Sequence, residues 1–355
     1  MKKNKTFIRL TQWEHWPTLM FYLPLIPYFS YKILSNKKLL YYLNTNPGIL
    51  YSGNGTESKY KTLLKVPEAV RPKSILFKRN DSFEALLQEL REKKISFPLI
   101  AKPDIGFRGY LVKKMGDESG LRSYINKFNE NILIQEFIPY QKELGIFYHR
   151  LPDENSGKIT SVTIKKFLVV EGNGKETLEE LIQNDNRAFL YYDLFKIIHK
   201  EYLTKIIPDN KKVTLSVIGN HSKGAEFLNG EHLITNELER LIDQIALKID
   251  GWYYGRLDIK YNSLNDLLNG KNFKILEVNG IISEPTHIYD ASFRGASYRK
   301  AVTTIKKHWE ILDRIAKKNM EISGIQTPKI LPYLKNMLWL RTYSKKLRRL
   351  NKADL

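Results

Sequence analysis

Two carboxylates, an amide and a guanidinium occur at alternate positions of two short segments of this chain. Arg256 and Asp258 lie in the first segment, and Glu277 and Asn279 lie in the second. Both segments alternate polar and apolar residues, as half-buried strands do, and side chains two residues apart on a strand share a face. Pairing of the two strands would gather these side chains on one surface. A few oxygen ligands suit Mg²⁺, which keeps positions open for phosphates, and an arginine can bind a phosphoryl group through two N–H groups.

A second interpretation of these strands is an exposed hairpin with a solvated polar face. Residues 262–272 between them are rich in Asn, Gly and Lys, which predicts a turn-forming connection. The metal-site interpretation therefore depends on whether other segments of the chain could bind a nucleotide.

A lysine and a glycine-containing loop farther upstream have the chemistry to bind phosphate. A short apolar strand, residues 97–101, leads into Lys102, and Gly106, Arg108 and Gly109 follow. Glycines let backbone amides approach phosphate oxygens closely, and Lys102 and Arg108 supply positive charge. A Gly-x-x-Gly loop by itself is usually only a turn, so the order of the segments carries the argument.

A buried strand followed by an extended, proline-bounded linker occupies residues 132–139. Backbone groups of such a linker can hydrogen-bond an adenine, and Glu143 shortly after it could accept hydrogen bonds from a ribose diol. The residues at the boundary between strand and linker are Gln135, Glu136, Phe137 and Ile138.

In their order and spacing, these segments resemble the ATP-grasp superfamily, and within it the carboxylate–amine ligases. Similar members are D-alanine–D-alanine ligase and the ligases that modify ribosomal proteins or synthesise cyanophycin. The resemblance covers about residues 57–310. It implies an α+β fold in which two lobes with antiparallel sheets clamp ATP, with Mg²⁺ as the cofactor and Mn²⁺ as its alternative.

The resemblance also implies roles for individual residues. The metal ligands would be Asp258, Glu277 and Asn279. ATP would be bound by Lys59 (a loose match), Lys102, Gly106, Arg108, Gly109, Gln135, Glu136, Phe137, Ile138, Glu143 and either Lys165 or Lys166. Adjacent residues point opposite ways on a strand, so only one of these last two lysines can face ATP. The residues expected to stabilise the transferring phosphoryl group are Arg256, Lys102 and Lys166.

Further segments resemble parts of the cyanophycin-type ligases or predict helices. Thr177 and Glu180 fit a capping box ahead of a helix over residues 178–200, and the polar residues 220–224 correspond to a loop near substrate. A simple turn and helix cap is the structural alternative for the first of these. Two more helices are expected, over 236–250, started by an Asn236-x-x-Glu239 box, and over 296–319.

Length and composition agree with an intracellular enzyme of several lobes. A chain of 355 residues can bury substantial cores, and 42% hydrophobic and 12% aromatic residues argue against disorder. The absence of cysteine excludes disulfides, thiolate metal sites and a cysteine nucleophile. Because no segment matches a cleavable signal peptide, a cytoplasmic location is expected.

Positive charge is concentrated near the C-terminus of a chain whose net charge is +20. No acidic residue occurs between Glu321 and Asp354. The basic residues there are Lys329, Lys335, Arg341, Lys345, Lys346, Arg348, Arg349 and Lys352, with leucines and aromatic residues among them. This pattern predicts a basic amphipathic helix for an anionic membrane surface or an acidic partner. A generally lysine-rich composition is the alternative explanation.

The N-terminal segment is aromatic and carries no charge from Trp16 to Tyr31. Prolines at positions 17, 24 and 27 make it a poor membrane-spanning helix. Tryptophan and tyrosine prefer the bilayer interface, so a peripheral anchor at the inner face of the membrane is one interpretation, and packing on the ligase lobes is the other.

These observations predict four parts and one favoured activity. The parts are a helical leader (1–56), a first ATP-grasp lobe (57–137), a second lobe with the metal site (138–320) and a basic tail (321–355). The favoured activity is an ATP-dependent ligase that joins a small-molecule or cell-envelope carboxylate to an amine through an acylphosphate.

Two alternatives to this activity remain open. One is an ATP-grasp phosphotransferase, and the other is a non-enzymatic basic protein that binds nucleic acid or membrane. The metal ligands disfavour nucleic acid as the partner, since a binding module has no need of them. The sequence leaves the oligomeric state open.

Overall fold

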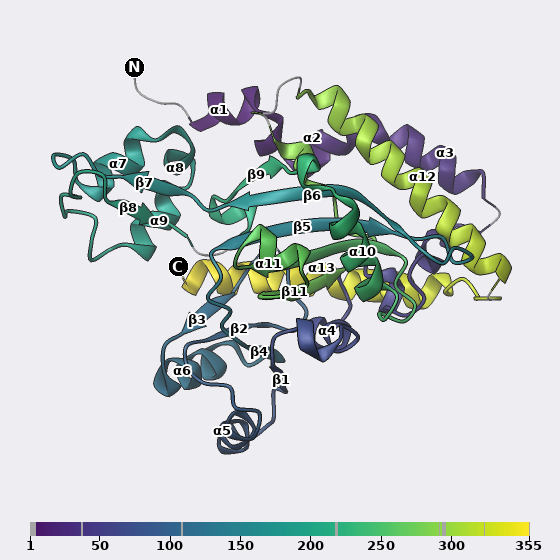
Figure 1. The fold of residues 1–355 in the computed structure, drawn as a ribbon, viewed down its shortest axis with the longest axis horizontal. Coiled ribbons are helices and arrows are strands. Elements are labelled where there is room, and N and C mark those ends of the chain that lie inside the picture. The colour runs from purple at the N-terminus through teal and green to yellow at the C-terminus, as the bar shows by residue number, and fades with distance from the viewer. Residues whose placement is uncertain are drawn as a thin grey trace.

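The computed structural model describes residues 5–36, 38–107, 109–216, 219–290, 292, 296–322 and 324–354. Its strands form a four-stranded and a five-stranded antiparallel sheet, together with a small two-stranded sheet, and helices pack around them (Figure 1). This confirms the predicted α+β fold with two main antiparallel sheets.

The four-stranded sheet is the centre of the first lobe. Its order is β1 (Ser74–Phe77), β4 (Ile132–Glu136), β2 (Leu99–Pro103) and β3 (Lys113–Met115). Two amphipathic helices, α5 (Phe83–Glu92) and α6 (Glu118–Phe128), cover it, and Ser82 and Asp117 cap their first turns. Leu86, Leu121 and Ile125 bury their side chains against the sheet. The sheet therefore leaves its other face for Lys102 and Gln135.

The five-stranded sheet is the centre of the second lobe. Its order is β11 (Phe273–Asn279), β10 (Tyr254–Tyr261), β5 (Lys142–His149), β6 (Lys158–Lys166) and β9 (Glu226–Asn229). Successive residues of a strand face opposite sides. Ile146 of β5 packs with α10 (Asn236–Ala246), whereas Phe147 packs with α12 (Tyr298–Ile322). Helices on both faces thus bury the central part of this sheet.

Several helices differ in detail from the sequence prediction. The side chain of Thr235, rather than Asn236, caps α10 by accepting a hydrogen bond from Leu238 N. The Thr177–Glu180 capping box is present, but the helix that follows it is broken into three pieces. These are α7 (Leu178–Asn184), α8 (Asn186–Leu190) and α9 (Tyr192–Ile198). The connection between β10 and β11 contains a short helix, α11 (Leu264–Leu268).

The three pieces α7 to α9 belong to a small unit with its own core. They pack against the two-stranded sheet of β7 (Val169–Glu171) and β8 (Lys212–Thr214), at the left of Figure 1. The core of this unit includes Ile182, Phe195 and Leu215, all fully buried.

The leader is a series of short helices that packs on the second lobe. These helices are α1 (Lys5–Thr11), η1 (Trp13–His15), α2 (Thr18–Tyr22), η2 (Leu23–Leu25), α3 (Ile26–Leu34), η3 (Tyr41–Asn44) and η4 (Leu50–Ser52). Phe21 and Leu25 are buried against Ile305 of α12, and α2 and α3 lie beside that helix in Figure 1. Internal packing, one of the two interpretations of the leader, is therefore part of the structure.

The end of the leader touches the end of the predicted metal strand. The backbone N–H groups of Ile281 and Ile282 donate to the carbonyl oxygens of Ser52 and Gly53. Gly53 has a φ of +78°, and a Cβ there would lie 2.6 Å from the Cα atom of Gly280. Glycine is needed at position 53 for both reasons.

The C-terminal helix α13 (Ile330–Asp354) contacts the leader and the first lobe. The ring of Tyr333 lies 5.3 Å from that of Tyr51 in the leader. At the other end, Leu347 is fully buried in the core of the first lobe, and Asn351 accepts a hydrogen bond from Leu111 N. The C-terminal half of α13 is thus docked on the first lobe. Among the described residues, no helix is both long and apolar enough to cross a membrane.

Because Leu347 is part of the core of the first lobe, Leu347→Ala should lower the free energy of unfolding by about 2–5 kcal/mol. Leu334→Ala in the same helix removes a half-exposed side chain and should change it by no more than about 0.5 kcal/mol. Thermal and urea unfolding of both variants measure the difference. Equal, small effects of the two substitutions would contradict the docking of α13.

Candidate nucleotide and metal site

The predicted metal strands pair so that their polar side chains meet. β10 and β11 are antiparallel, with Arg256 opposite Asn279 and Asp258 opposite Glu277. The side-chain amide nitrogen of Asn279 lies 3.3 Å from Asp258 Oδ2. On the next strand, Gly145 lies opposite Asp258, and its lack of a side chain leaves room for the Arg256 stem, 3.0 Å from where a Cβ would be. The four residues therefore share one face of the sheet.

Two cations of the second lobe pair with Asp258. Arg256 Nε lies 2.9 Å from Asp258 Oδ1, and Lys165 Nζ lies 3.1 Å from the same oxygen. Lys165 Nζ also lies 2.6 Å from Glu143 Oε1. Since Glu143, Lys165 and Asp258 are all buried, these ion pairs are largely shielded from solvent.

Two further lysines come from residues 57–137. Lys59, in the first turn of α4 (Lys59–Leu64), forms an ion pair with Glu277. Lys102 of β2 is buried, and its Nζ lies 3.4 Å from Gln135 Oε1. Asp104 helps to place Lys59, because its Oδ1 accepts hydrogen bonds from Ser58 and from the backbone of Tyr60. We call the set Lys59, Lys102, Glu143, Lys165, Arg256, Asp258 and Glu277 the charge cluster.

The pKa values of the charge cluster show which charges are held in place. Burial favours the neutral form of Asp258, but Arg256 and Lys165 outweigh it and hold its pKa below the usual range. Burial likewise opposes ionisation of Glu277, yet Lys59 and Lys102 lower its pKa. Both carboxylates are therefore charged at neutral pH.

The lysines of the charge cluster respond differently to burial. Burial opposes the charge of Lys165, but Asp258 and Glu143 outweigh it and raise its pKa. Burial lowers the pKa of Lys102, because the attraction of Glu277 does not compensate fully. Lys102 is thus the cation of the cluster that lacks an adequate counter-charge, as expected for a residue that meets an anionic ligand.

The structure distinguishes the two adjacent lysines of β6. Lys165 points into the charge cluster, whereas Lys166 points away from it, is 64% exposed and lies 3.2 Å from Glu226. Of these two lysines, between which the sequence left the choice open, Lys165 thus lies in the charge cluster and Lys166, expected to be catalytic, lies outside it. The reason is the two-residue period of the strand, which allows only one of two neighbours on each face.

The predicted glycine loop follows β2. Gly109 has a φ of +68°, a conformation that other residues adopt only with strain, and the backbone of Leu111 is fixed by Asn351 of α13. A Cβ at Gly106 would lie 3.9 Å from the Lys59 side chain, so this part of the loop is close to the charge cluster. Arg108 lies outside the described residues.

The predicted adenine-binding residues lie where the chain passes from the first sheet to the second. Gln135 is buried with its side chain toward Lys102, whereas Glu136 accepts a hydrogen bond from the backbone of Lys73. The ring of Phe137 lies 4.1 Å from Lys114 Nζ, and the carbonyl of Ile138 accepts from Lys260 at 3.5 Å. The side chain of Glu136 and its backbone N–H, which donates to the Lys73 carbonyl, are therefore both engaged within the protein.

The leader and the loop just before residues 220–224, which the resemblance placed near substrate, both reach this site. The Glu284 side chain accepts hydrogen bonds from Tyr22 of the leader and from Tyr289, and its carbonyl accepts from Arg256 at 3.2 Å. From another direction, Gly219 comes so close to Glu143 that a Cβ would lie 2.7 Å from Glu143 Oε2. No spacing or motif in the sequence pairs these positions.

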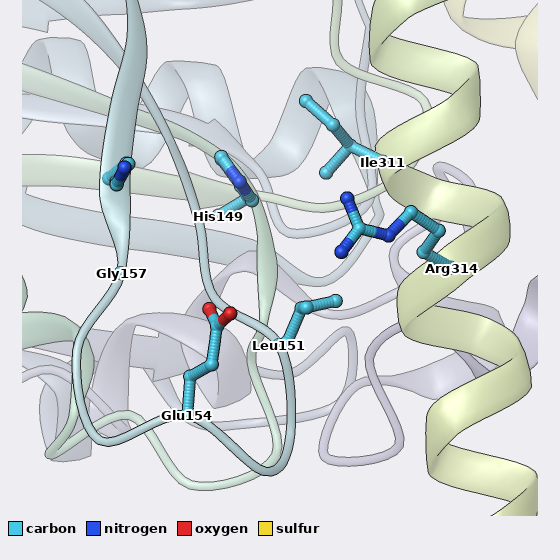
Figure 2. Close-up of a pocket in the computed structure, with 7 residues that line it drawn as sticks. His149, Leu151, Glu154, Gly157, Ile311 and Arg314 are labelled. Carbon is cyan, nitrogen blue, oxygen red and sulfur yellow. The ribbon is translucent and has the colours of Figure 1, made fainter.

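A separate surface pocket lies at the other end of β5. It is lined by His149, Leu151, Glu154, Gly157, Lys158, Ile311 and Arg314, most of them labelled in Figure 2. Six residues of strand separate His149 from Glu143, a distance of about 20 Å. This pocket is therefore distinct from the charge cluster, and its mixed charges give no indication of a nucleotide site.

Comparison with known proteins finds likeness among solved structures. No family model matches the chain, and no curated protein matches it. The bifunctional glutathione synthetase of Pasteurella multocida is 16% identical with a TM-score of 0.39, over 71% of this chain and 36% of its own length. The VanG D-Ala:D-Ser ligase of Enterococcus faecalis is 17% identical with a TM-score of 0.41, over 72% of this chain and 62% of its own length.

The D-alanine–D-alanine ligase of Bacillus anthracis is similar to the same degree. It is 14% identical with a TM-score of 0.40, over 76% of this chain and 71% of its own. The chain thus spans about a third of the glutathione synthetase and less than two-thirds of the VanG ligase. At these identities and scores the alignments do not bear on reaction or substrate.

The two adjacent lysines provide a matched test of the charge cluster. Lys165→Met removes a buried cation from beside two carboxylates, so it should abolish the thermal stabilisation by Mg-ATP and reduce ATP turnover by about 100-fold or more. Lys166→Met removes an exposed cation on the other face and should leave both properties near wild type. Thermal unfolding with and without Mg-ATP measures the stabilisation, and ADP release measures the turnover. A stronger effect of Lys166→Met would contradict this geometry.

Proposed function

We propose that this protein is an ATP-dependent ligase that joins a carboxylate to an amine. The observation that supports it is the buried set of alternating charges to which both lobes contribute. Lys59 and Lys102 approach from one side, and Arg256, Asp258 and Glu277 from the other. The motifs that resemble ATP-grasp ligases place their phosphate-binding and metal-binding residues in these positions.

The donor set of the charge cluster fits Mg²⁺ bound to nucleotide phosphates. Asp258 and Glu277 are charged carboxylates opposite each other on neighbouring strands, and the amide of Asn279 adjoins Asp258. These three residues would hold the metal, which would neutralise phosphate charge and polarise the γ-phosphoryl group. The lysines now paired with the carboxylates would then be available to phosphate oxygens.

The reaction proposed has two steps. A carboxylate oxygen of the first substrate attacks the γ-phosphorus of ATP, and the bond to the β–γ bridging oxygen breaks, giving an acylphosphate and ADP. The amine of the second substrate then attacks the acyl carbon and expels inorganic phosphate, and the amine loses a proton. Lys102, Lys165 and Arg256 would stabilise the transferring group by charge and position.

The surroundings of Arg256 are where we place the carboxylate substrate. Its guanidinium reaches the Glu284 carbonyl as well as Asp258, and Tyr22 and Tyr289 hydrogen-bond the Glu284 side chain. His287 is poorly suited to act as a general base, because its Nδ1 is already paired with the Ser161 hydroxyl at 2.7 Å. The cell-envelope carboxylate remains the preferred substrate class, with other small molecules as the alternative.

A screen of carboxylates with and without amines tests the proposal and separates it from phosphotransfer. A ligase should form ADP and phosphate in equal amounts only when both substrates are present, with a new amide detected by mass spectrometry. Glu277→Gln should abolish this turnover, because it removes a charged metal ligand while preserving shape. ADP formation with a stable phosphorylated product would indicate the phosphotransferase instead, and normal turnover of Glu277→Gln would refute the metal assignment.

We further propose that α13 brings the enzyme to an anionic membrane surface. Leu331, Leu334, Leu338 and Trp339 are 45–73% exposed on the half of this helix that precedes its docking on the first lobe. Exposed basic residues, including Lys335 and Arg341, lie among or just after them. Such a face combines apolar area with positive charge, as interfacial helices do. Exposed Leu19 and Leu23 of the leader are the second part of this proposal.

Sedimentation with vesicles tests the membrane proposal without disturbing the buried end of α13. Wild type should bind vesicles that contain phosphatidylserine and release at high salt, since screening weakens the attraction. The double variant Leu334→Ser/Leu338→Ser should bind much less, while its unfolding temperature stays near wild type. Binding that ignores lipid charge, or that the double variant retains, would refute the role of this helix.

A further inference from the structure

Two histidines and a glutamate from distant parts of the chain converge outside the charge cluster. Glu14 and His15 belong to η1 of the leader, and His221 begins η6 (His221–Lys223). One ligand atom from each lies within 4.8 Å of the other two. The Glu14 and His15 side chains are only 8% and 6% exposed, and His221 is 21% exposed. We call this set the Glu14–His221 cluster.

The His15 imidazole makes this cluster more than a hydrogen-bonded contact. Its Nε2 atom is buried and has no hydrogen-bond partner in the structure. It lies 3.6 Å from Glu14 Oε1, too far for a hydrogen bond. A buried, unpartnered ring nitrogen is costly, and a bound ion is one of the explanations for it.

The distances in the cluster suit tetrahedral coordination of a small metal ion. Two ligands bonded at about 2.0–2.1 Å with a tetrahedral angle lie about 3.3–3.4 Å apart. His15 Nε2 lies 3.6 Å from Glu14 Oε1, close to this separation, whereas His221 Nε2 is hydrogen-bonded at 3.0 Å to the other carboxylate oxygen, Oε2, and would exchange that hydrogen bond for the ion. Small side-chain movements would bring all three donors to one ion.

Arg187 holds the glutamate of the cluster without occupying the space between the histidines. Its Nη1 lies 2.9 Å from Glu14 Oε2, and its other nitrogens donate to the carbonyls of Gly224 and Ala225. The guanidinium is therefore fixed on one side of the carboxylate, and Oε1 is directed toward His15. Carboxylate ligands of metals are commonly held by such hydrogen bonds.

We propose that Glu14, His15 and His221 form a binding site for Zn²⁺. Two imidazole nitrogens and one carboxylate oxygen are a borderline donor set that favours Zn²⁺ over Mg²⁺, and they leave a fourth position for water. The metal ties the leader to the loop that carries Gly219, which lies against Glu143 of the charge cluster. This site is independent of the proposed ligase activity.

Zinc binding to the full-length protein, first stripped of metal by a chelator, tests the proposal. Titration calorimetry in excess Mg²⁺ should show one Zn²⁺ per chain, and Zn²⁺ should raise the unfolding temperature by mass action. His15→Phe keeps a planar ring and removes a nitrogen that has no hydrogen-bond partner. This substitution should weaken Zn²⁺ binding by more than about 100-fold. Loss of a residue that only hydrogen-bonds a metal ligand typically weakens metal binding by less than that.

Controls separate this site from other metal-binding groups of the chain. His232→Gln removes an exposed histidine of η7 (Glu231–Leu233) and should leave Zn²⁺ binding unchanged, as should Glu277→Gln in the charge cluster. If His15→Phe does not fold, two other measurements test the site. His221→Gln should weaken Zn²⁺ binding, and Co²⁺-loaded wild type should absorb strongly in the visible range, as tetrahedral Co²⁺ with nitrogen ligands does. Absence of one-to-one binding in wild type, or equal binding by His15→Phe, would overturn the proposal.

Discussion

The ion pairs of the charge cluster are the interaction on which the candidate site depends. A buried carboxylate without a cation is very costly, and removal of one partner from a buried pair typically costs about 3–5 kcal/mol. Glu277 of the second lobe is paired with Lys59, which precedes the first sheet, and Asp258 is paired with Lys165 and Arg256. The helix α4 that carries Lys59 packs through Leu63 in the core of the second sheet, so these ion pairs assemble mainly around that sheet, and Lys102 is the charge that the first sheet contributes.

The same charges explain why such a site is suited to a ligand that carries both negative charge and a metal. Mg-ATP offers phosphate oxygens to the lysines and Mg²⁺ to the carboxylates, so each buried group exchanges one partner for another of the same sign. Few other ligands could separate Lys59 from Glu277 without leaving one of them unpaired. The folded protein already holds these charges in place, so they need little reorganisation when a ligand binds.

The sequence predicted those parts of the structure that follow from local periodicity. Alternation located β10 and β11 and placed Arg256, Asp258, Glu277 and Asn279 on one face, because the two-residue period is a property of the strand itself. The same period required that only one of Lys165 and Lys166 face the site, but which one depends on the pairing of β6 with β5, and this is a tertiary contact. The cap of α10 was displaced by one residue because Thr235 and Asn236 are both good caps.

Contacts between distant segments could not be predicted in this way. The composition of the tail indicated an amphipathic helix, yet nothing in it showed that Leu347 fills the core of the first lobe. The same holds for Tyr22 beside Glu284 and for Gly53 against Gly280. These contacts depend on shape complementarity between elements far apart in sequence, on which a single sequence carries no signal.

Helix α13 connects the leader to the first lobe. Tyr333 touches the leader, which is hydrogen-bonded to the end of the metal strand, and eighteen residues later Asn351 fixes the loop that follows Lys102. Eighteen helical residues span about 27 Å, so one helix reaches from the leader to the loop that follows β2 at the candidate site. The end at Leu347 is buried, whereas the half around Leu334 and Leu338 is largely exposed. The helix is therefore held to the first lobe by its C-terminal half and meets the leader through Tyr333.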